Sequence, residues 1–299
     1  MNRMSEFVLS TESTIDLDYE TVKKRNLSVI YYHYYLDNEC FVDDFGQSMP
    51  YAEFYQKMRD GVDTHTTQIN QNEYVEYFAP ILEQGKDILH VCFSSGLTGT
   101  VNSALLAQEE LQKLYPQRKL VILDSLCASS GFGLLMNKIA DLRDAGRSMD
   151  EICRWVNENR RSVYHWFFST DLSFYVKGGR ISHAAGYIGS LLHICPLLDV
   201  DPDGRLRPVE KVRTKKKAIL RAVEEMVASA KDGADYAEDC FISHSDAPED
   251  AQAVARLLET HFARLAGKIR IFSIGTTIGS NTGPGTVSLF FWGKQPRRA

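Results

Sequence analysis

Residues 88–100 read ILHVCFSSGLTGT, and this stretch decides the fold class. Its first six residues are apolar except for His90, a pattern typical of a strand buried on both faces of a parallel sheet. A glycine-containing turn follows, then a predicted helix over 101–114 and a second buried strand over 120–123. Strands that alternate with helices of this length indicate βαβ units. The sequence therefore predicts an α/β protein whose N-terminal domain has three α/β/α layers and a mainly parallel sheet.

The pattern changes after Ser148, which opens a capping box with Glu151. A strand is predicted over 164–169, and the turn residues 201–204 (DPDG) separate two further strand-like runs. This turn chemistry is typical of a hairpin. We therefore expect a smaller C-terminal α+β domain with a mixed sheet. The predicted division is 1–160 for the parallel domain, which carries the hydroxyl motifs, and 161–299 for the second domain.

Composition excludes several classes of protein. The 299 residues include 34 basic and 39 acidic side chains, a net charge of −5, so a general nucleic-acid binder is not expected. No apolar run approaches the roughly 18 residues that would predict a membrane span. The N-terminus lacks the pattern of a secretory signal, so a cytoplasmic location and no integral membrane contact are expected.

The six cysteines are widely spaced and form no C-x-x-C pair, and the eight histidines form no H-x-H or H-E-x-x-H pair. A disulfide framework is expected in small secreted chains, so these cysteines are interpreted as buried free thiols. The sequence gives no support for a local zinc site.

The turn over 94–100 is the main candidate binding site. Ser94 and Ser95 offer hydroxyl donors, and Gly96 lets the backbone approach a ligand closely. The turn lies where ligands bind in parallel sheets, beyond the carboxyl end of a strand and at the start of a helix, which favours an anion. The pattern is neither a phosphate-binding Walker loop nor a G-x-S-x-G nucleophile elbow. A simple tight turn remains the alternative.

Two further hydroxyl-bearing segments occupy equivalent places, because residues 10–14 (STEST) follow the first predicted strand and Asp124-Ser125 follow the strand over 120–123. In addition, residues 64–68 (THTTQ) form a predicted loop before a helix that Asn70 caps. Hydroxyls with little basic charge suit a single carboxylate better than a polyphosphate. Ordinary capping of loops would place the same residue types there.

Four other segments carry an open interpretation. Arg180 follows paired glycines and either recognises a carboxylate or is a solvated residue after a helix. Residues 279–286 (GSNTGPGT) are interpreted as a loop that exposes its backbone. The apolar segment 181–198 is either core or the wall of a tunnel. The basic run over 211–221 is either a solvated helix face or a docking surface for an acidic or phosphorylated partner.

Taken together, the motifs resemble those of the DegV family of bacterial fatty-acid-binding proteins. Six matches occur in order along the chain: 10–14 with T-D-S-T, 66–70 with T-S-Q-P-S, 94–100 with S-S-G-L-S-G-T, 178–182 with G-G-R-[IL]-S, 211–214 with K-[VI]-R-T, and 282–286 with T-G-P-G-T. This chain departs from the pattern at Glu12, which replaces Asp, at Ile69-Asn70, which replace Pro-Ser, and at Asn281, where many members carry His.

The resemblance implies a non-catalytic protein that holds one long-chain fatty acid, such as palmitate or oleate, in a tunnel between two domains. It also implies presentation of the carboxylate to a partner fatty acid kinase, which forms an acyl phosphate, and it calls for no cofactor or metal. The motif positions assign the ligand to Ser13, Thr66, Thr67, Ser94, Ser95, Gly96, Arg180 and Asn281, with Arg180 either near the head group or facing the kinase.

Two other functions remain open from the residues alone. One is a serine-dependent acyl hydrolase or transferase, with Ser94 or Ser95 as the nucleophile and His65, His244 or another histidine as the base. The other is a regulatory module that binds a small anion.

Overall fold

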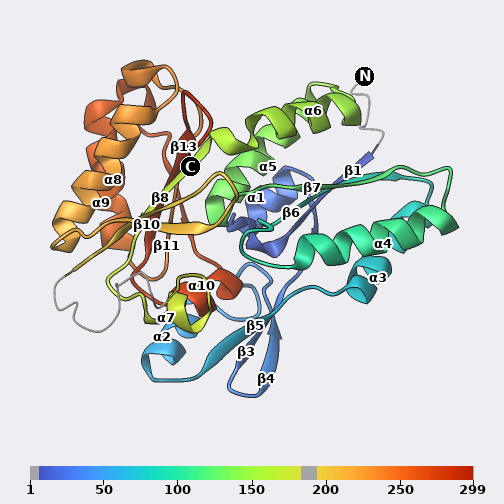
Figure 1. Ribbon diagram of the computed structural model, residues 1–299, viewed down its shortest axis with the longest axis horizontal. Helices are drawn as coiled ribbons and strands as arrows, with labels where there is room; N and C mark the ends of the chain where they lie inside the picture. The colour runs from blue at the N-terminus through green and yellow to red at the C-terminus, as the bar shows by residue number, and fades with distance from the viewer. Residues whose placement is uncertain (1–6, 183–193, 299) are drawn as a thin grey trace.

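The computed structural model describes residues 7–182 and 194–298, so most of the apolar segment 181–198 lies outside the described residues. Figure 1 shows two main sheets with helices around them and a small sheet below, formed by β3, β4 and β5. None of the helices that the described residues form is long and apolar enough to cross a bilayer.

The first sheet is parallel throughout, with the order β2-β1-β6-β7. Its strands are β1 (Phe7–Glu12), β2 (Ser28–Ile30), β6 (Asp87–Cys92) and β7 (Leu120–Asp124). One face packs against α3 (Gln71–Glu83) and α4 (Thr100–Leu114). The other face packs against α1 (Tyr19–Lys24), α5 (Ser129–Asp144) and α6 (Met149–Asn159). The predicted α/β architecture with a parallel sheet is confirmed.

The second sheet is mixed and has the order β10-β9-β8-β13-β11-β12. Its strands are β8 (Val163–Phe168), β9 (Leu197–Val200), β10 (Leu206–Glu210), β11 (Phe241–His244), β12 (Arg270–Ser273) and β13 (Val287–Trp292). Only β11 and β12 pair in parallel among these strands. Helices α8 (Lys215–Ser229) and α9 (Pro248–His261) complete this part of the molecule, and the predicted mixed sheet is confirmed.

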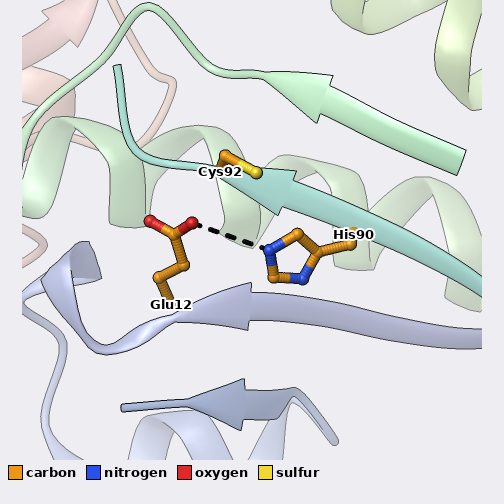
Figure 2. A group of neighbouring side chains, drawn as sticks. All are labelled: Glu12, His90 and Cys92. Atoms are coloured by element: carbon orange, nitrogen blue, oxygen red, sulfur yellow. Dashed lines mark ion pairs between the residues drawn. The ribbon is translucent and has the colours of Figure 1, made fainter. Parts of the chain in front are cut away.

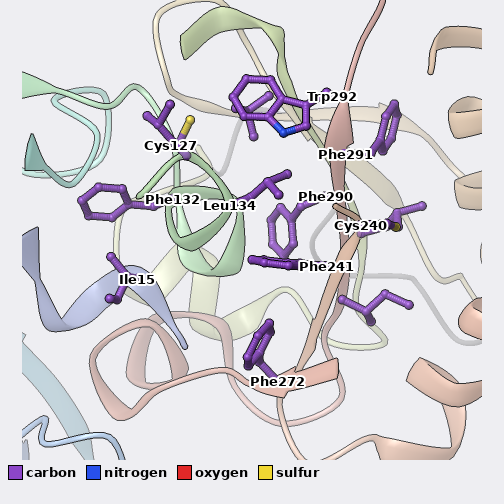
Figure 3. Packing of buried hydrophobic residues seen from close by; sticks show 14 of the residues in the cluster. Ile15, Cys127, Phe132, Leu134, Cys240, Phe241, Phe272, Phe290, Phe291 and Trp292 are labelled. Atoms are coloured by element: carbon purple, nitrogen blue, oxygen red, sulfur yellow. The ribbon is translucent and has the colours of Figure 1, made fainter. Parts of the chain in front are cut away.

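Helix α5 joins the two sheets through a shared core. Phe132 and Leu134 of this helix belong to the same buried cluster as Leu89 of β6 and Phe290 of β13. Figure 3 shows the aromatic side chains of β11 and β13 beside this helix. The last strand of the parallel sheet ends at Asp124 and the first strand of the mixed sheet begins at Val163. The domain division at 160 stays a prediction.

The third sheet was not expected. It is antiparallel, with the order β4-β3-β5, and consists of β3 (His33–Leu36), β4 (Glu39–Val42) and β5 (Thr64–Thr67). The interpretation of 64–68 as a loop was therefore wrong. Its β-branched threonines suit a strand, but the pairing partner lies about thirty residues earlier in the chain, and a local pattern does not reveal it.

Residues 279–286 were also interpreted wrongly, because residues up to Thr282 belong to α10 (Thr276–Thr282). The start of this helix is capped by distant side chains instead of by its own sequence. Asp16 accepts a hydrogen bond from the Gly275 N–H (2.9 Å), and Asp43 accepts one from the Thr277 N–H (3.3 Å). Tertiary capping of this kind satisfies the free N–H groups of a helix without a local signal. Two further helices, α2 (Tyr51–Arg59) and α7 (Ser173–Lys177), lie near α10.

The predictions that depend on residues close together in the sequence are confirmed. Ser148 and Glu151 form the predicted capping box of α6. Residues 201–204 connect β9 and β10, which pair antiparallel as predicted. Asn70 and Glu73 form a second capping box at the start of α3.

Candidate functional site

A cavity of about 330 Å³ lies where the three sheets meet. Tyr32, Phe93 and Ser129 line it, and they lie just beyond β2, β6 and β7, at the carboxyl ends of the parallel strands. His165 of β8 and Phe290 of β13 line it from the mixed sheet. The cavity therefore occupies the position at which open parallel sheets bind ligands.

The third sheet and α10 contribute polar groups to the wall. Thr66 and Thr67 of β5 line the cavity together with Asn281 of α10. The amide of Asn281 donates to Thr66 Oγ1 (3.3 Å) and to the carbonyl oxygen of Thr277 (2.9 Å). Because both amide hydrogens are used in this way, Asn281 fixes the position of Thr66 relative to α10.

Arg180 brings a positive charge to this wall. Its guanidinium donates to the carbonyl oxygen of Gly178, and it has no acidic side chain within ion-pair distance among the described residues. Burial lowers the pKa of Arg180, and the neighbouring Tyr32 opposes this effect. An arginine stays protonated under such conditions. The cavity thus contains a partly desolvated cation for which residues 7–182 and 194–298 supply no anionic partner.

Most of the remaining wall is apolar. Its aromatic and aliphatic members come from both main sheets and from α10 and its approach: Phe93, Leu97, Ala128, Phe167, Val200, Leu206, Ile274, Ile278 and Phe290. A mainly apolar cavity with a few convergent polar groups is the usual form of a small-molecule site. The composition suits an apolar ligand with one anionic end.

His165 is a cavity residue that sequence reasoning missed. Its Nε2 accepts a hydrogen bond from the Ala128 N–H (3.1 Å), and its Nδ1 donates to the carbonyl oxygen of Val163 (3.0 Å). Burial, and then the charge of Arg297, hold the pKa of His165 well below its usual range. The ring is therefore neutral, and it leaves this part of the wall uncharged. Nothing in its sequence neighbourhood pointed to the cavity.

Tyr32 and Thr98 are also cavity residues that sequence reasoning missed. The Tyr32 hydroxyl lies 2.8 Å from Thr100 Oγ1, and Thr98 Oγ1 lies 2.9 Å from the same threonine oxygen. The threonines of the 94–100 turn therefore orient the tyrosine at the cavity wall. The position of Thr98 within this motif was the available signal.

The two serines of the 94–100 turn do not line the cavity. Ser94 is buried, and its hydroxyl donates to the carbonyl oxygen of Gly204 (2.8 Å) in the turn between β9 and β10. Ser95 is exposed, and its hydroxyl donates to Asp124 (2.5 Å). These contacts give both hydroxyls a structural partner.

Gly96 and Ser13 have comparable structural contacts. A Cβ atom at Gly96 would lie 2.6 Å from the carbonyl oxygen of Asp203, so only glycine permits this approach. Ser13 Oγ accepts a hydrogen bond from the Tyr32 N–H (3.0 Å). Of the predicted ligand residues, the structure brings together Thr66, Thr67, Arg180 and Asn281 at the cavity. It places Ser13, Ser94, Ser95 and Gly96 outside the wall.

The geometry offers no support for a serine nucleophile. Within residues 7–182 and 194–298, neither Ser94 nor Ser95 has a hydrogen bond to a histidine. The ring of His65 stacks on Tyr35, and His244 Nδ1 accepts from the Ala247 N–H (3.2 Å). A nucleophile needs a base within hydrogen-bond reach, and neither histidine is in contact with these serines.

Comparison with known proteins identifies the family of this chain. The model of the DegV family matches residues 6–294. A DegV domain-containing protein of Clostridium perfringens is 37% identical over 295 residues, which cover 98% of this chain and 100% of the relative.

Two solved structures have the same fold. A fatty-acid-binding DegV family protein from Thermus thermophilus has a TM-score of 0.83 and 25% identity, with 96% of this chain and 99% of that chain covered. The Streptococcus pneumoniae fatty acid kinase B3 protein, loaded with linoleic acid, has a TM-score of 0.81 and 22% identity, with 96% and 99% covered. The resemblance in the motifs is thus confirmed over almost the whole chain, and the protein belongs to the DegV family.

Proposed function

We propose that the chain encloses one long-chain fatty acid in the 330 Å³ cavity and binds its carboxylate at Arg180, Thr66 and Thr67, with Asn281 holding Thr66 in position. The observation that carries this proposal is a guanidinium that has no acidic partner among the described residues and lies with hydroxyl groups at the wall of a mainly apolar cavity. The Thermus thermophilus relative, which binds a fatty acid, supports the same ligand class.

The free energy of binding such a ligand is consistent with the composition of the cavity wall. Each buried methylene contributes about 0.8 kcal/mol, so a long acyl chain compensates for the free energy lost when the chain is ordered. The carboxylate is the difficult part, since burial of an unpaired charge is strongly unfavourable. A charge-assisted hydrogen bond from Arg180, with neutral donors nearby, meets this requirement.

The finer part of the proposal is that the chain is a non-catalytic subunit that presents the carboxylate to a fatty acid kinase. Arg180 and Leu97 line both the cavity and an adjoining surface depression, which Gly178 and Arg205 also line. A head group beside Arg180 would thus lie near the protein surface. In the kinase reaction a carboxylate oxygen would attack the γ-phosphorus of ATP, form the acyl phosphate and release ADP. The S. pneumoniae protein, which is named for such a kinase, supports this role.

The test is a comparison of ligands on delipidated protein. A long-chain free acid should bind with one site per chain, and its methyl ester, which lacks the charge, should bind more weakly. Addition of a bacterial fatty acid kinase and ATP should convert the bound acid to acyl phosphate only when this chain is present. Equal binding of acid and ester would contradict the head-group assignment, and no acyl phosphate formation with an active kinase would contradict the presenting role.

A further inference from the structure

A buried group of potential metal ligands lies behind the cavity, where β1 and β6 pair in parallel. Ser10 of β1 is opposite His90 of β6 in the register of this pair. Alternate residues of a strand point to the same face, so Glu12 shares a face with Ser10, and Cys92 shares one with His90. Figure 2 shows the side chain of Glu12 extending from β1 toward His90 and Cys92 on β6.

The distances within this group fit a single ion. His90 Nε2 lies 3.7 Å from Glu12 Oε1, and the ligand atoms of Glu12, His90 and Cys92 all lie within 4.8 Å of one another. Tetrahedral zinc, with bonds of about 2.0–2.3 Å, separates its ligand atoms by roughly 3.3–3.8 Å. The glutamate and the histidine already have this spacing, and the Cys92 thiol, which lies within 4.8 Å of both, would have to approach them by up to about 1 Å.

The hydrogen bonds of His90 provide an independent indication. Its Nδ1 lies 2.8 Å from Ser10 Oγ, whereas its Nε2 has no hydrogen-bond partner within the described parts of the chain. The ring is fully buried, and Nε2 is the nitrogen that faces the carboxylate of Glu12. A hydrogen bond on one ring nitrogen leaves the other free to ligate a metal. With Nδ1–H donating to Ser10 Oγ, Nε2 would face the carboxylate with its lone pair, and a metal cation between the two atoms would satisfy both groups.

The buried carboxylate of Glu12 also favours a cation between Glu12 and His90. The carboxylate is fully buried and accepts hydrogen bonds from the Phe93 N–H (2.9 Å), the Tyr32 hydroxyl (3.3 Å) and the Tyr74 hydroxyl. All three donors are neutral, and the only cationic partner that the described residues offer is His90, if it is protonated. Burial of a charge without a partner is costly.

We propose that Glu12, His90 and Cys92 bind one Zn²⁺ ion in a structural site that links β1 to β6. A carboxylate, an imidazole and a thiolate form a ligand set typical of zinc, and their two negative charges balance the ion. The Tyr74 hydroxyl donates to the same carboxylate, so it would hold Glu12 in place as an outer hydrogen-bond partner of the site. Local sequence motifs do not reveal this site, because Glu12 lies on the neighbouring strand, 78 residues before His90 in the chain.

The test uses the full-length chain, purified without an affinity tag of histidines and without chelators. Elemental analysis should find about one zinc ion per chain. Replacement of zinc by Co²⁺ should give the near-ultraviolet thiolate-to-cobalt charge-transfer band and the intense visible bands of a tetrahedral site. Both signals should be lost in Cys92→Ser and remain in Cys127→Ser, because Cys127 is equally buried but contacts the Arg160 carbonyl oxygen instead.

A second measurement covers the case in which Cys92→Ser does not fold. A strong chelator should lower the melting temperature of the unmodified protein and of Cys127→Ser, and added zinc should restore it. The proposal is wrong if the unmodified protein contains no stoichiometric zinc and gives no charge-transfer band with Co²⁺. In that case a chelator would leave the melting temperature unchanged.

Discussion

At the scale of single residues, Arg180 is the decisive group of the proposed head-group site. Arg180→Gln removes the charge but keeps hydrogen-bond donors, so affinity for a long-chain free acid should fall roughly 10- to 100-fold, the usual effect of losing one charge-assisted hydrogen bond. Affinity for the methyl ester should change little. Arg205→Gln is the matched control, because Arg205 lines only the adjoining depression and pairs with Asp203. Titration calorimetry would measure all four combinations, and equal losses in the two variants would contradict the role of Arg180.

His165 carries a prediction about pH. Burial keeps the pKa of this ring well below its usual value, whereas in the unfolded chain it titrates near 6.5. Below that pH the unfolded state binds a proton that the folded state does not, so the free energy of unfolding falls as the pH decreases. Between pH 7.5 and pH 5.5 the free energy of unfolding should fall by about 1 kcal/mol more in the unmodified protein than in His165→Gln. The glutamine side chain can accept the hydrogen bond from the Ala128 N–H but cannot titrate. Denaturant unfolding at both pH values measures this difference, and parallel losses would contradict it.

At the level of elements, the turn over 94–100 contacts the turn of the β9–β10 hairpin and holds this hairpin against the parallel sheet. Gly96→Ala would place a methyl group 2.6 Å from backbone atoms of 203 and 204, which must then move. We expect a destabilisation of about 1–3 kcal/mol, typical of overpacking. Glu109→Ala, on the exposed face of α4, should change stability by less than about 0.5 kcal/mol. Equal stability of the two variants in denaturant unfolding would show that the close contact of Gly96 with the hairpin does not stabilise the protein.

The same elements show how far sequence alone predicts this molecule. The buried strand over 88–93, the capping box at Ser148 and the turn over 201–204 depend on neighbouring residues, and each was predicted. Strand β5 and helix α10 depend on His33–Leu36, Asp16 and Asp43, which are distant in sequence, and both were missed. The cavity has the same origin: Thr66, Arg180 and Asn281 were identified by their motifs, whereas Tyr32 and His165 reach it only through the fold.

At the scale of the whole molecule, the cavity joins parts that are far apart in the chain. Ser94 contacts Gly204, and Asp16 connects Ser129 of α5 to Gly275 before α10. A ligand that fills the cavity contacts all three sheets and therefore favours the folded state over the unfolded one. At a free ligand concentration of 100 Kd, this stabilisation amounts to about 2.7 kcal/mol.

Thermal unfolding therefore provides a prediction for the whole chain. Delipidated protein should melt at a lower temperature than protein reloaded with a long-chain fatty acid, and the increase should grow with ligand concentration. Differential scanning calorimetry measures both states. A melting temperature that does not respond to a saturating fatty acid would contradict a ligand site shared by the three sheets.

Native mass spectrometry of the protein as purified from a bacterial host, followed by extraction and identification of the bound molecule, tests the proposed ligand most directly. The folded chain should exceed its sequence mass by one long-chain fatty acid, and organic extraction should release this acid with its carboxylate free. Fatty-acid binding is contradicted if the folded protein has its bare sequence mass and takes up no added fatty acid, or if it carries a polar molecule in place of a lipid.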